Sequence, residues 1–320
     1  MITKEQEILK DESKAGRYLP WREKKLANVH YYELLHILQF KKASRVKVCA
    51  EVLEFKQDKK TGERTLYNAW FCKSRLCALC NWRRTMKHGV QSEKVIREVM
   101  NRVPTARWLF LTLSVKNVYD GDELDRSFKE LSQGFNRLVK YKKVAKNMIG
   151  FMRASEVTVN DVDGSYNQHI HVLACVKPTY FKDSTNYISQ SELTNLWRKA
   201  MKLDYDPIVH ISVVKPKNKY QDDMRGAINE VAKYPVKDTD YLTENEEKNL
   251  KRVKDLEKGL QYKRLLGYGG LLREIHKELN LDDAEDGNLI NIDGEERIKD
   301  DEAYSVFAQW NWKRKNYYIR

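Results

Sequence analysis

The sequence has no long hydrophobic run, no internal repeat and no low-complexity tract, and only five of its 320 residues are cysteines. A membrane-spanning helix needs roughly 18 or more consecutive apolar residues, which this chain does not contain. Residues 1–10 are polar and charged, unlike the apolar core of a secretion signal. We therefore expect neither a membrane-spanning nor a secreted protein, but a cytoplasmic one.

Acidic side chains are too few to balance the basic ones, since 46 Asp and Glu residues oppose 59 Lys and Arg residues, a net charge of +13. This excess of cations indicates a polyanionic partner, for which nucleic acid is the default. A hydrophobic fraction of 41% with 11% aromatics supplies a sizeable core and excludes wholesale disorder. The length favours two domains, or one domain enlarged by additions.

Two histidines lie in a segment that is typical of a β-strand, residues 166–176. Side chains two residues apart in a strand share a face about 7 Å apart, so His169 and His171 can bind one divalent metal. The alternative is an ordinary strand with two half-exposed histidines. Asp163-Gly164 predicts a turn just before this strand.

A second strand is expected at residues 150–160, antiparallel to the first. Glu156 on this strand can complete a Glu-His-His site that leaves positions open for water and a phosphate oxygen; otherwise it is a surface residue. Imidazole and carboxylate ligands together suit Mn²⁺, with Mg²⁺ as the substitute in the cell. His210, in an expected strand at 207–214, is either a fourth ligand or a structural residue.

A later helix is expected to end or kink at Pro235. Glu230 and Tyr234 are four residues apart and project from one face of this helix. Lys233 and Lys237 flank the tyrosine. Cations near a phenol favour its ionised form, and they can also bind a phosphate group that the phenol would attack. Taken alone, an aromatic residue at a helix end is a packing residue.

Four of the cysteines gather near an expected hairpin of residues 45–55 and 65–71. A Cys-x4-Cys-x2-Cys knuckle brings thiolates close enough for one tetrahedral zinc ion, and a further cysteine is available as the fourth ligand. Such a structural zinc fastens the hairpin to the next helix; the alternative is a set of buried free thiols. The cysteines are clustered and the chain shows no secretion signal, and both observations disfavour disulfide bonds. The proposed ligands are Cys49, Cys72, Cys77 and Cys80.

Two basic clusters are candidates for contact with DNA phosphates, Arg83 with Arg84, and Lys140 with Lys142 and Lys143. The alternative for the arginine cluster is a helix face exposed to solvent. The lysine cluster lies at the end of an expected helix, where its positive charges also interact favourably with the helix dipole. Aromatic residues interleave with cations in residues 304–320, where they either stack on bases or dock on the domain surface.

Three segments in order resemble the rolling-circle plasmid replication initiators of Gram-positive bacteria, a branch of the His-hydrophobic-His (HUH) endonucleases. They are Phe-Leu-Thr-Leu-Ser-Val at 110–115, the His-Ile-His segment 166–173, and Glu-Val-Ala-Lys-Tyr-Pro-Val-Lys at 230–237. The cysteine knuckle and the Gly-Tyr-Gly-Gly-Leu segment at 267–271, expected to be a turn, are similar as well. Many members have a further histidine where this chain has Asn167, which places more weight on Glu156 as a ligand.

The patterns and the resemblance together predict an α+β fold. A central antiparallel sheet with flanking helices carries the His-x-His strand, accompanied by a cysteine-rich N-terminal hairpin and a helical C-terminal region. The expected domains are a basic region at 1–104, the nicking domain at 105–242 and an accessory DNA-binding region at 243–320.

The resemblance implies that Tyr234 attacks the scissile phosphate beside the metal, giving a 5′-phosphotyrosine and a 3′-OH primer. Glu230 would activate water for termination, as in members with a single nucleophilic tyrosine; Tyr241 lies beyond Pro235 and is not read as a second one. The implied partners are hairpin-forming origin DNA with a single-stranded nick site, a host helicase and a host polymerase. Whether the protein forms a homodimer is left open. Alternatives are a relaxase or transposase of the same chemistry, or a non-catalytic zinc-stabilised DNA-binding regulator.

Overall fold

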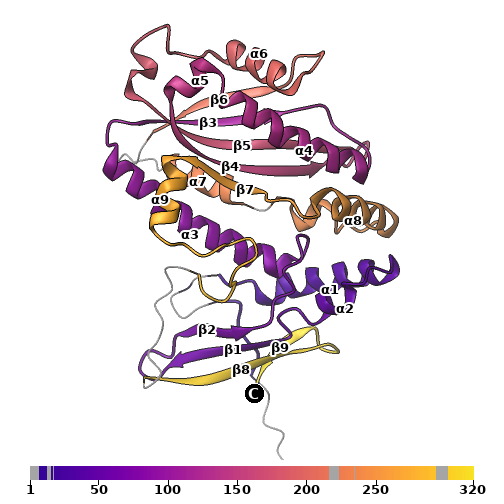
Figure 1. Cartoon of the computed structure of the whole chain (residues 1–320). Helices are drawn as coiled ribbons and strands as arrows, with labels where there is room; N and C mark the ends of the chain where they lie inside the picture. Colours follow the sequence, from indigo (N-terminus) through magenta and orange to yellow (C-terminus); the bar gives the residue numbers. More distant parts are fainter. Residues whose placement is uncertain (1–6, 13–15, 17, 216–222, 234, 293–301) are drawn as a thin grey trace, which may run out of the picture. The chain divides into compact units, whose positions relative to one another are not determined.

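The computed structural model describes residues 7–12, 16, 18–215, 223–233, 235–292 and 302–320 (Figure 1). They form two compact units that interleave along the chain, one of Met1–Lys87, Tyr241–Val253 and Asp283–Arg320, the other of His88–Asp240 and Lys254–Asp282. No helix within the described ranges is long and apolar enough to cross a membrane.

The unit of residues 88–240 and 254–282 is built on a five-stranded antiparallel sheet in the order β6-β3-β5-β4-β7. The central strand β5 is buried almost along its whole length because strands flank it and helices cover both faces. The strands are β3 (Arg107–Ser114), β4 (Met148–Val159), β5 (Tyr166–Val176), β6 (Val209–Val214) and β7 (Leu266–Gly270).

Helices α4 and α6 cover one face of this sheet, and α7 and α9 cover the other (Figure 1). Phe135 of α4 packs edge-on against Phe151 of β4, with ring centroids 4.9 Å apart. On the opposite face, Met152 of β4 joins a core with Val231 of α7 and Ile275 of α9. The helices of this unit are α4 (Gly121–Leu138), α5 (Lys142–Asn147), η1 (Pro178–Phe181), α6 (Gln190–Met201), α7 (Asp223–Ala232), η2 (Asp238–Asp240) and α9 (Leu271–Glu278). Helix α3 (Ala78–Arg102) belongs to both units.

The glycine-rich segment 267–270, expected to be a turn, is instead most of strand β7 at the edge of the sheet. A Cβ on Gly269 would lie 2.2 Å from the ring of Phe151, and Gly270 has a φ of +57°. Glycine is therefore needed here for close approach to β4 and for a left-handed residue at the start of α9.

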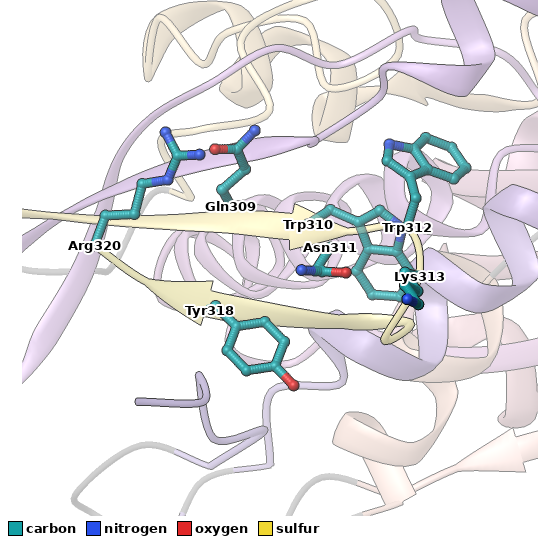
Figure 2. Close-up of a pocket in the computed structure, with 7 residues that line it drawn as sticks. All are labelled: Gln309, Trp310, Asn311, Trp312, Lys313, Tyr318 and Arg320. Carbon is teal, nitrogen blue, oxygen red and sulfur yellow. The ribbon is translucent and has the colours of Figure 1, made fainter. Parts of the chain in front are cut away.

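The other unit contains a four-stranded antiparallel sheet in the order β2-β1-β8-β9. The N-terminal hairpin that the sequence predicted is present as β1 and β2, but its first strand begins at Val52, because residues 43–47 form a short helix instead of a strand. The C-terminal hairpin of β8 and β9 (Figure 2) extends its sheet. The elements are α1 (Trp21–Ile37), α2 (Ala43–Lys47), β1 (Val52–Asp58), β2 (Arg64–Ala69), β8 (Ala303–Asn311) and β9 (Asn316–Ile319). Helix α8 (Glu246–Leu260) belongs to both units.

The predicted α+β class, with a central antiparallel sheet carrying the His-x-His strand, is confirmed. The region 243–320 contains the helices α8 and α9, but also the strands β7, β8 and β9. Because β8 pairs with β1, the C-terminal residues join the unit of the N-terminal hairpin. A division into consecutive segments at 104 and 242 does not describe this pairing.

Candidate active site

Strands β4 and β5 bring three side chains together on one face of the five-stranded sheet. Their register sets Glu156 directly opposite His169, and His171 follows two residues later on the same face. His171 Nε2 lies 3.1 Å from both His169 Nε2 and Glu156 Oε2, and His169 Nε2 lies 3.5 Å from the same oxygen. The side chains that the sequence predicted as metal ligands therefore converge.

The three side chains are buried, with exposed fractions of 4% for Glu156, 8% for His169 and 7% for His171. Burial raises the pKa of Glu156, but interactions with His169 and His171 and the charge of Lys233 outweigh it. They hold this pKa well below its usual range. Glu156 is therefore a carboxylate, the form that binds a cation.

A second layer of side chains orients the two imidazoles. Thr112 lies opposite His171 in the β3–β5 pair, and its Oγ1 is 3.1 Å from His171 Nδ1. Asn167 Oδ1 is 3.1 Å from His169 Nδ1 and accepts a hydrogen bond from it. In the tautomer that binds a metal ion, each Nδ1 would carry the proton and the lone pair of each Nε2 would point into the cluster.

The sequence predicted a role at the site for neither residue of this layer. Segment 110–115, which contains Thr112, was recognised only as a family motif, and Asn167 only as the position of a missing histidine ligand. The available signal was the position of Asn167 two residues before His169, on the same face of the strand.

Helix α7 and the residue that follows it add two charged groups to the cluster. Glu230 Oε1 lies 3.6 Å from His171 Nε2, and Lys233 Nζ lies 3.1 Å from Glu156 Oε2. Lys233 also pairs with Glu230 one turn earlier on the helix. Burial lowers the pKa of Lys233, but its hydrogen bond to Glu230 and the charge of Glu156 outweigh burial and raise the pKa. Lys233 is therefore a permanent cation between two carboxylates.

The predicted nucleophile, Tyr234, lies outside the described residues. Its sequence neighbours on both sides are placed, since Lys233 contacts Glu156, and the Pro235 carbonyl accepts a hydrogen bond of 2.8 Å from the Val157 N–H of β4. Lys237 is exposed. The segment on either side of Tyr234 therefore runs along β4 at the carboxylate of Glu156.

The donor set at this cluster fits a divalent metal ion. An octahedral ion with bonds of about 2.1 Å needs adjacent donor atoms about 3.0 Å apart, close to the observed separations. Glu156 Oε2 is buried and has no well-aligned hydrogen bond to any residue in the described part of the chain. His210 is exposed on β6 and does not belong to the group whose ligand atoms lie within 4.8 Å of one another.

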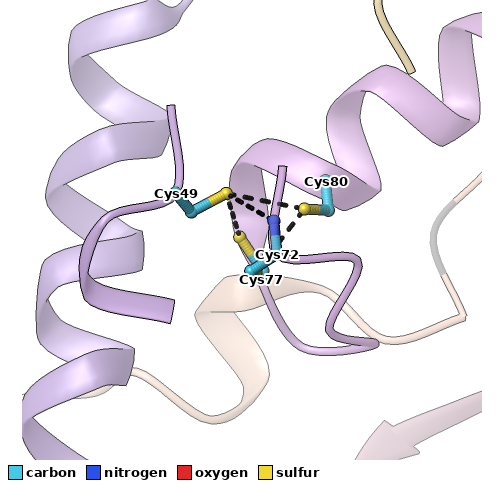
Figure 3. Close-up of side chains that lie close together, drawn as sticks. All are labelled: Cys49, Cys72, Cys77 and Cys80. Atoms are coloured by element: carbon cyan, nitrogen blue, oxygen red, sulfur yellow. Dashed lines mark hydrogen bonds between the residues drawn. The ribbon is translucent and has the colours of Figure 1, made fainter. Parts of the chain in front are cut away.

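The unit that contains the four-stranded sheet holds a second group of metal ligands (Figure 3). Four cysteines that form no disulfide are at most 1% exposed, and three pairs of their sulfur atoms lie 3.6–3.7 Å apart. Tetrahedral zinc with Zn–S bonds of about 2.3 Å places sulfur atoms about 3.8 Å apart. The group fits structural zinc and consists of Cys49, Cys72, Cys77 and Cys80.

N–H groups donate hydrogen bonds to three of these sulfur atoms. Burial raises the pKa of Cys77, but hydrogen bonds from the other three cysteines outweigh it and lower this pKa well below its usual value. Lys25 is fully buried beside the cluster and donates hydrogen bonds to the Lys47 and Cys49 carbonyls. The N–H donors to sulfur are the backbone amides of Cys72 and Lys73 and the side-chain amide of Asn28.

The expected phosphate contact of Arg83 and Arg84 is wrong for this conformation, because they are only 2% and 5% exposed. Arg83 donates to the Leu289 and Ile290 carbonyls. Arg84 donates to backbone carbonyls of the cysteine loop and to that of Glu285. Both guanidinium groups therefore tie segment 283–292 to the cysteine knuckle.

The three lysines of the second basic cluster differ in their exposure and contacts. Lys143 forms an ion pair with Glu192, with Nζ–oxygen distances of 2.8 and 2.9 Å. Lys140 and Lys142 are exposed. These two lysines keep the accessibility that a phosphate contact requires, and their contact with DNA stays a prediction.

Substituting Thr112 by valine should weaken metal binding by about 10- to 100-fold, because His171 loses the group that orients its ring. Titration of the protein with Mn²⁺, followed by calorimetry, measures this affinity directly. Thr194→Val, which removes a threonine hydroxyl from helix α6, is the matched control. Equal Mn²⁺ affinity for Thr112→Val and the parent protein would show that Thr112 does not orient the ligand.

Comparison with known proteins supplies the family. A family model described as "Replication protein" (Rep_1) matches residues 63–318. A "Replication protein" from Staphylococcus aureus is 60% identical over 235 residues, covering 73% of this chain and 100% of that protein. A "Protein rep" from Lactiplantibacillus plantarum is 47% identical over 317 residues, covering 98% of this chain and 99% of that protein.

A "Protein rep" from Streptococcus pneumoniae is 41% identical over 318 residues, covering 98% of this chain and 96% of that protein. No solved structure matches the chain. The matches confirm the resemblance to plasmid replication initiators that the motifs indicated, and the chain belongs to the Rep_1 family of replication proteins.

Proposed function

We propose that this protein initiates rolling-circle replication of a plasmid by nicking one DNA strand at the origin, with Tyr234 as the nucleophile. One observation carries the proposal: the ligand atoms of Glu156, His169 and His171 converge within 4.8 Å of one another in a replication protein. Lys233, which directly follows helix α7 and precedes Tyr234, belongs to the same cluster.

The cluster would hold one divalent cation, Mn²⁺ or, in the cell, Mg²⁺. When bound, the cation withdraws negative charge from the scissile phosphate and so favours attack at phosphorus. Glu156 supplies the anionic ligand, and the imidazoles of His169 and His171 supply neutral ones. Thr112 and Asn167 keep these rings in the required orientation.

In the nicking step, the phenol oxygen of Tyr234 forms a bond to phosphorus, and the bond from phosphorus to the 3′ oxygen breaks. The phenol gives up its proton and the departing 3′ oxygen takes one up, which leaves a 3′-OH on one strand and a 5′-phosphotyrosine on the protein. Lys233 and Lys237 supply cations that stabilise the phenolate and bind the phosphate. The 3′-OH then primes synthesis by a host polymerase on DNA opened by a host helicase.

Termination requires a base that can reach water. The side chain of Glu230 is 43% exposed, although its carboxylate lies against His171. We propose that Glu230 accepts a proton from water as the water oxygen attacks phosphorus; the bond from phosphorus to the Tyr234 oxygen breaks, and the phenol recovers its proton. Lys233 holds the Glu230 carboxylate in place through their ion pair.

The nicking activity is tested with an end-labelled single-stranded oligonucleotide that carries the plasmid origin, incubated with the protein and Mn²⁺. The expected result is a covalent protein–DNA band on a denaturing gel together with a shortened strand bearing a 3′-OH. Binding of the origin without cleavage in Mn²⁺ and in Mg²⁺ would favour the non-catalytic regulator instead.

Substituting Glu230 by alanine should leave nicking within about tenfold of the parent rate but slow release of the phosphotyrosine by about 10²-fold, because the base for water is lost. The covalent band then accumulates over time. Glu230→Gln keeps the size of the side chain and serves as the control for packing against Lys233. Complete loss of nicking in both variants would assign Glu230 a role in the first step.

A further inference from the structure

A groove of about 340 Å³ lies on the β8–β9 hairpin, far along the chain from the Glu-His-His cluster (Figure 2). This volume is within the range of small-molecule sites, about 300–1,000 Å³. The residues that line the groove are Gln309, Trp310, Asn311, Trp312, Lys313, Tyr318 and Arg320. They include aromatic rings, amides and cations, and none of them is acidic.

The strand register sets the polar and aromatic groups on one face of the sheet. Gln309 and Tyr318 lie directly opposite each other, and Asn311 is two residues after Gln309 on the same face. Trp310, between Gln309 and Asn311, borders the groove but is only 3% exposed and packs against Tyr317. The groove therefore offers two side-chain amides beside one partly exposed phenol ring.

Further aromatic and cationic side chains lie next to the groove. Phe307 lies two residues before Gln309 and is 42% exposed. Arg314 is 5.3 Å from the centroid of the Tyr318 ring, which adds a cation to Lys313 and Arg320. Glu54 lies opposite Phe307, and its carboxylate accepts a hydrogen bond from Ser305.

We propose that this groove binds a nucleotide of single-stranded DNA. The base stacks on Tyr318, the amides of Gln309 and Asn311 hydrogen-bond to its edge, and Lys313 and Arg320 bind the flanking phosphates. Phe307 supplies a second stacking surface for the next base. Aromatic rings interleaved with cations, without carboxylates in the lining, match the alternating bases and phosphates of a single strand.

The chemistry of the groove favours a single strand over two other occupants. A duplex keeps its base faces stacked and hidden, so that Tyr318 and Phe307 would have no partner. An acidic protein segment could pair with the cations but would not need two amides beside an aromatic ring. The proposal does not depend on the nucleophile, because binding is measured where no strand is cleaved.

The test uses the full chain with Tyr234→Phe as background, and a labelled single-stranded oligonucleotide of about 12 nucleotides, within the usual range of single-strand sites. Fluorescence anisotropy gives the affinity. Tyr318→Ala should weaken binding about 5- to 150-fold, the effect of one lost base stack, whereas Tyr318→Phe should bind nearly as well as the parent. Lys313→Gln and Arg320→Gln should each reduce the salt dependence of log K by about 0.7.

Two controls separate local from general effects. Tyr262 is 92% exposed in the other unit, so Tyr262→Ala should not change the affinity. An oligonucleotide containing iodouracil, irradiated on the protein, should crosslink to residues 303–320. Unchanged affinity of Tyr318→Ala, a crosslink confined to other peptides, or tighter binding of the matched duplex would each overturn the proposal. Thermal unfolding of every variant checks that the fold is kept.

Discussion

Replacing Tyr234 by phenylalanine is expected to abolish the covalent protein–DNA band and to reduce nicking by roughly 10⁴-fold or more. Phenylalanine keeps the ring but lacks the oxygen that forms the bond to phosphorus. Glu156, His169 and His171 are unchanged, so Mn²⁺ affinity should stay at the parent value. The measurement is the rate of product formation from end-labelled origin oligonucleotide in Mn²⁺, with DNA binding measured in parallel.

Tyr241 provides the matched control. Its side chain is fully buried, and its hydroxyl donates a hydrogen bond to the Leu76 carbonyl. Tyr241→Phe should therefore lose about 1 kcal/mol of stability from a buried hydrogen bond and keep its nicking activity. Nicking by Tyr234→Phe at the parent rate, or loss of the band in Tyr241→Phe alone, would show that the nucleophile has been assigned to the wrong residue.

The local part of the candidate site could be predicted from the sequence. The alternation of side chains along a strand placed His169 and His171 on one face, and the short turn before them made β4 an antiparallel neighbour. Glu156 follows from that pairing, because a hairpin fixes which residues lie opposite each other. The spacing of Glu230 and Tyr234, four residues apart on one predicted helix face, was equally local.

The rest depended on contacts between distant parts of the chain. Thr112 reaches His171 only because β3 pairs with β5, and no short-range pattern gives the register of that pair. The pairing of β8 with β1 likewise joins residues about 250 positions apart, such as Phe55 and Val306. Arg84 was read as a surface cation because its carbonyl partner on Glu285 comes from such a distant segment.

Substituting Cys77 by alanine should reduce bound zinc from one equivalent per chain to near zero and prevent the unit with the four-stranded sheet from folding stably. Structural zinc sites contribute about 10–16 kcal/mol of binding free energy, comparable to the whole stability of a domain. Without the ion, the buried thiolates must take up protons, and the ammonium group of the fully buried Lys25 then loses the negative charge that balances it. Elemental analysis measures the zinc, and circular dichroism follows thermal unfolding.

Cys175 is the control, since it is buried in the core of the other unit, outside the four-cysteine group. Burial alone raises the pKa of Cys175 to about 12, so it is a neutral thiol and acts as a small apolar side chain. Cys175→Ala should keep one equivalent of zinc and lose only the packing of one sulfur atom. A metal-free parent protein with the same unfolding temperature as the zinc-loaded form would mean that these four cysteines are buried thiols, and that the knuckle is held by Arg84 and its carbonyl partners instead.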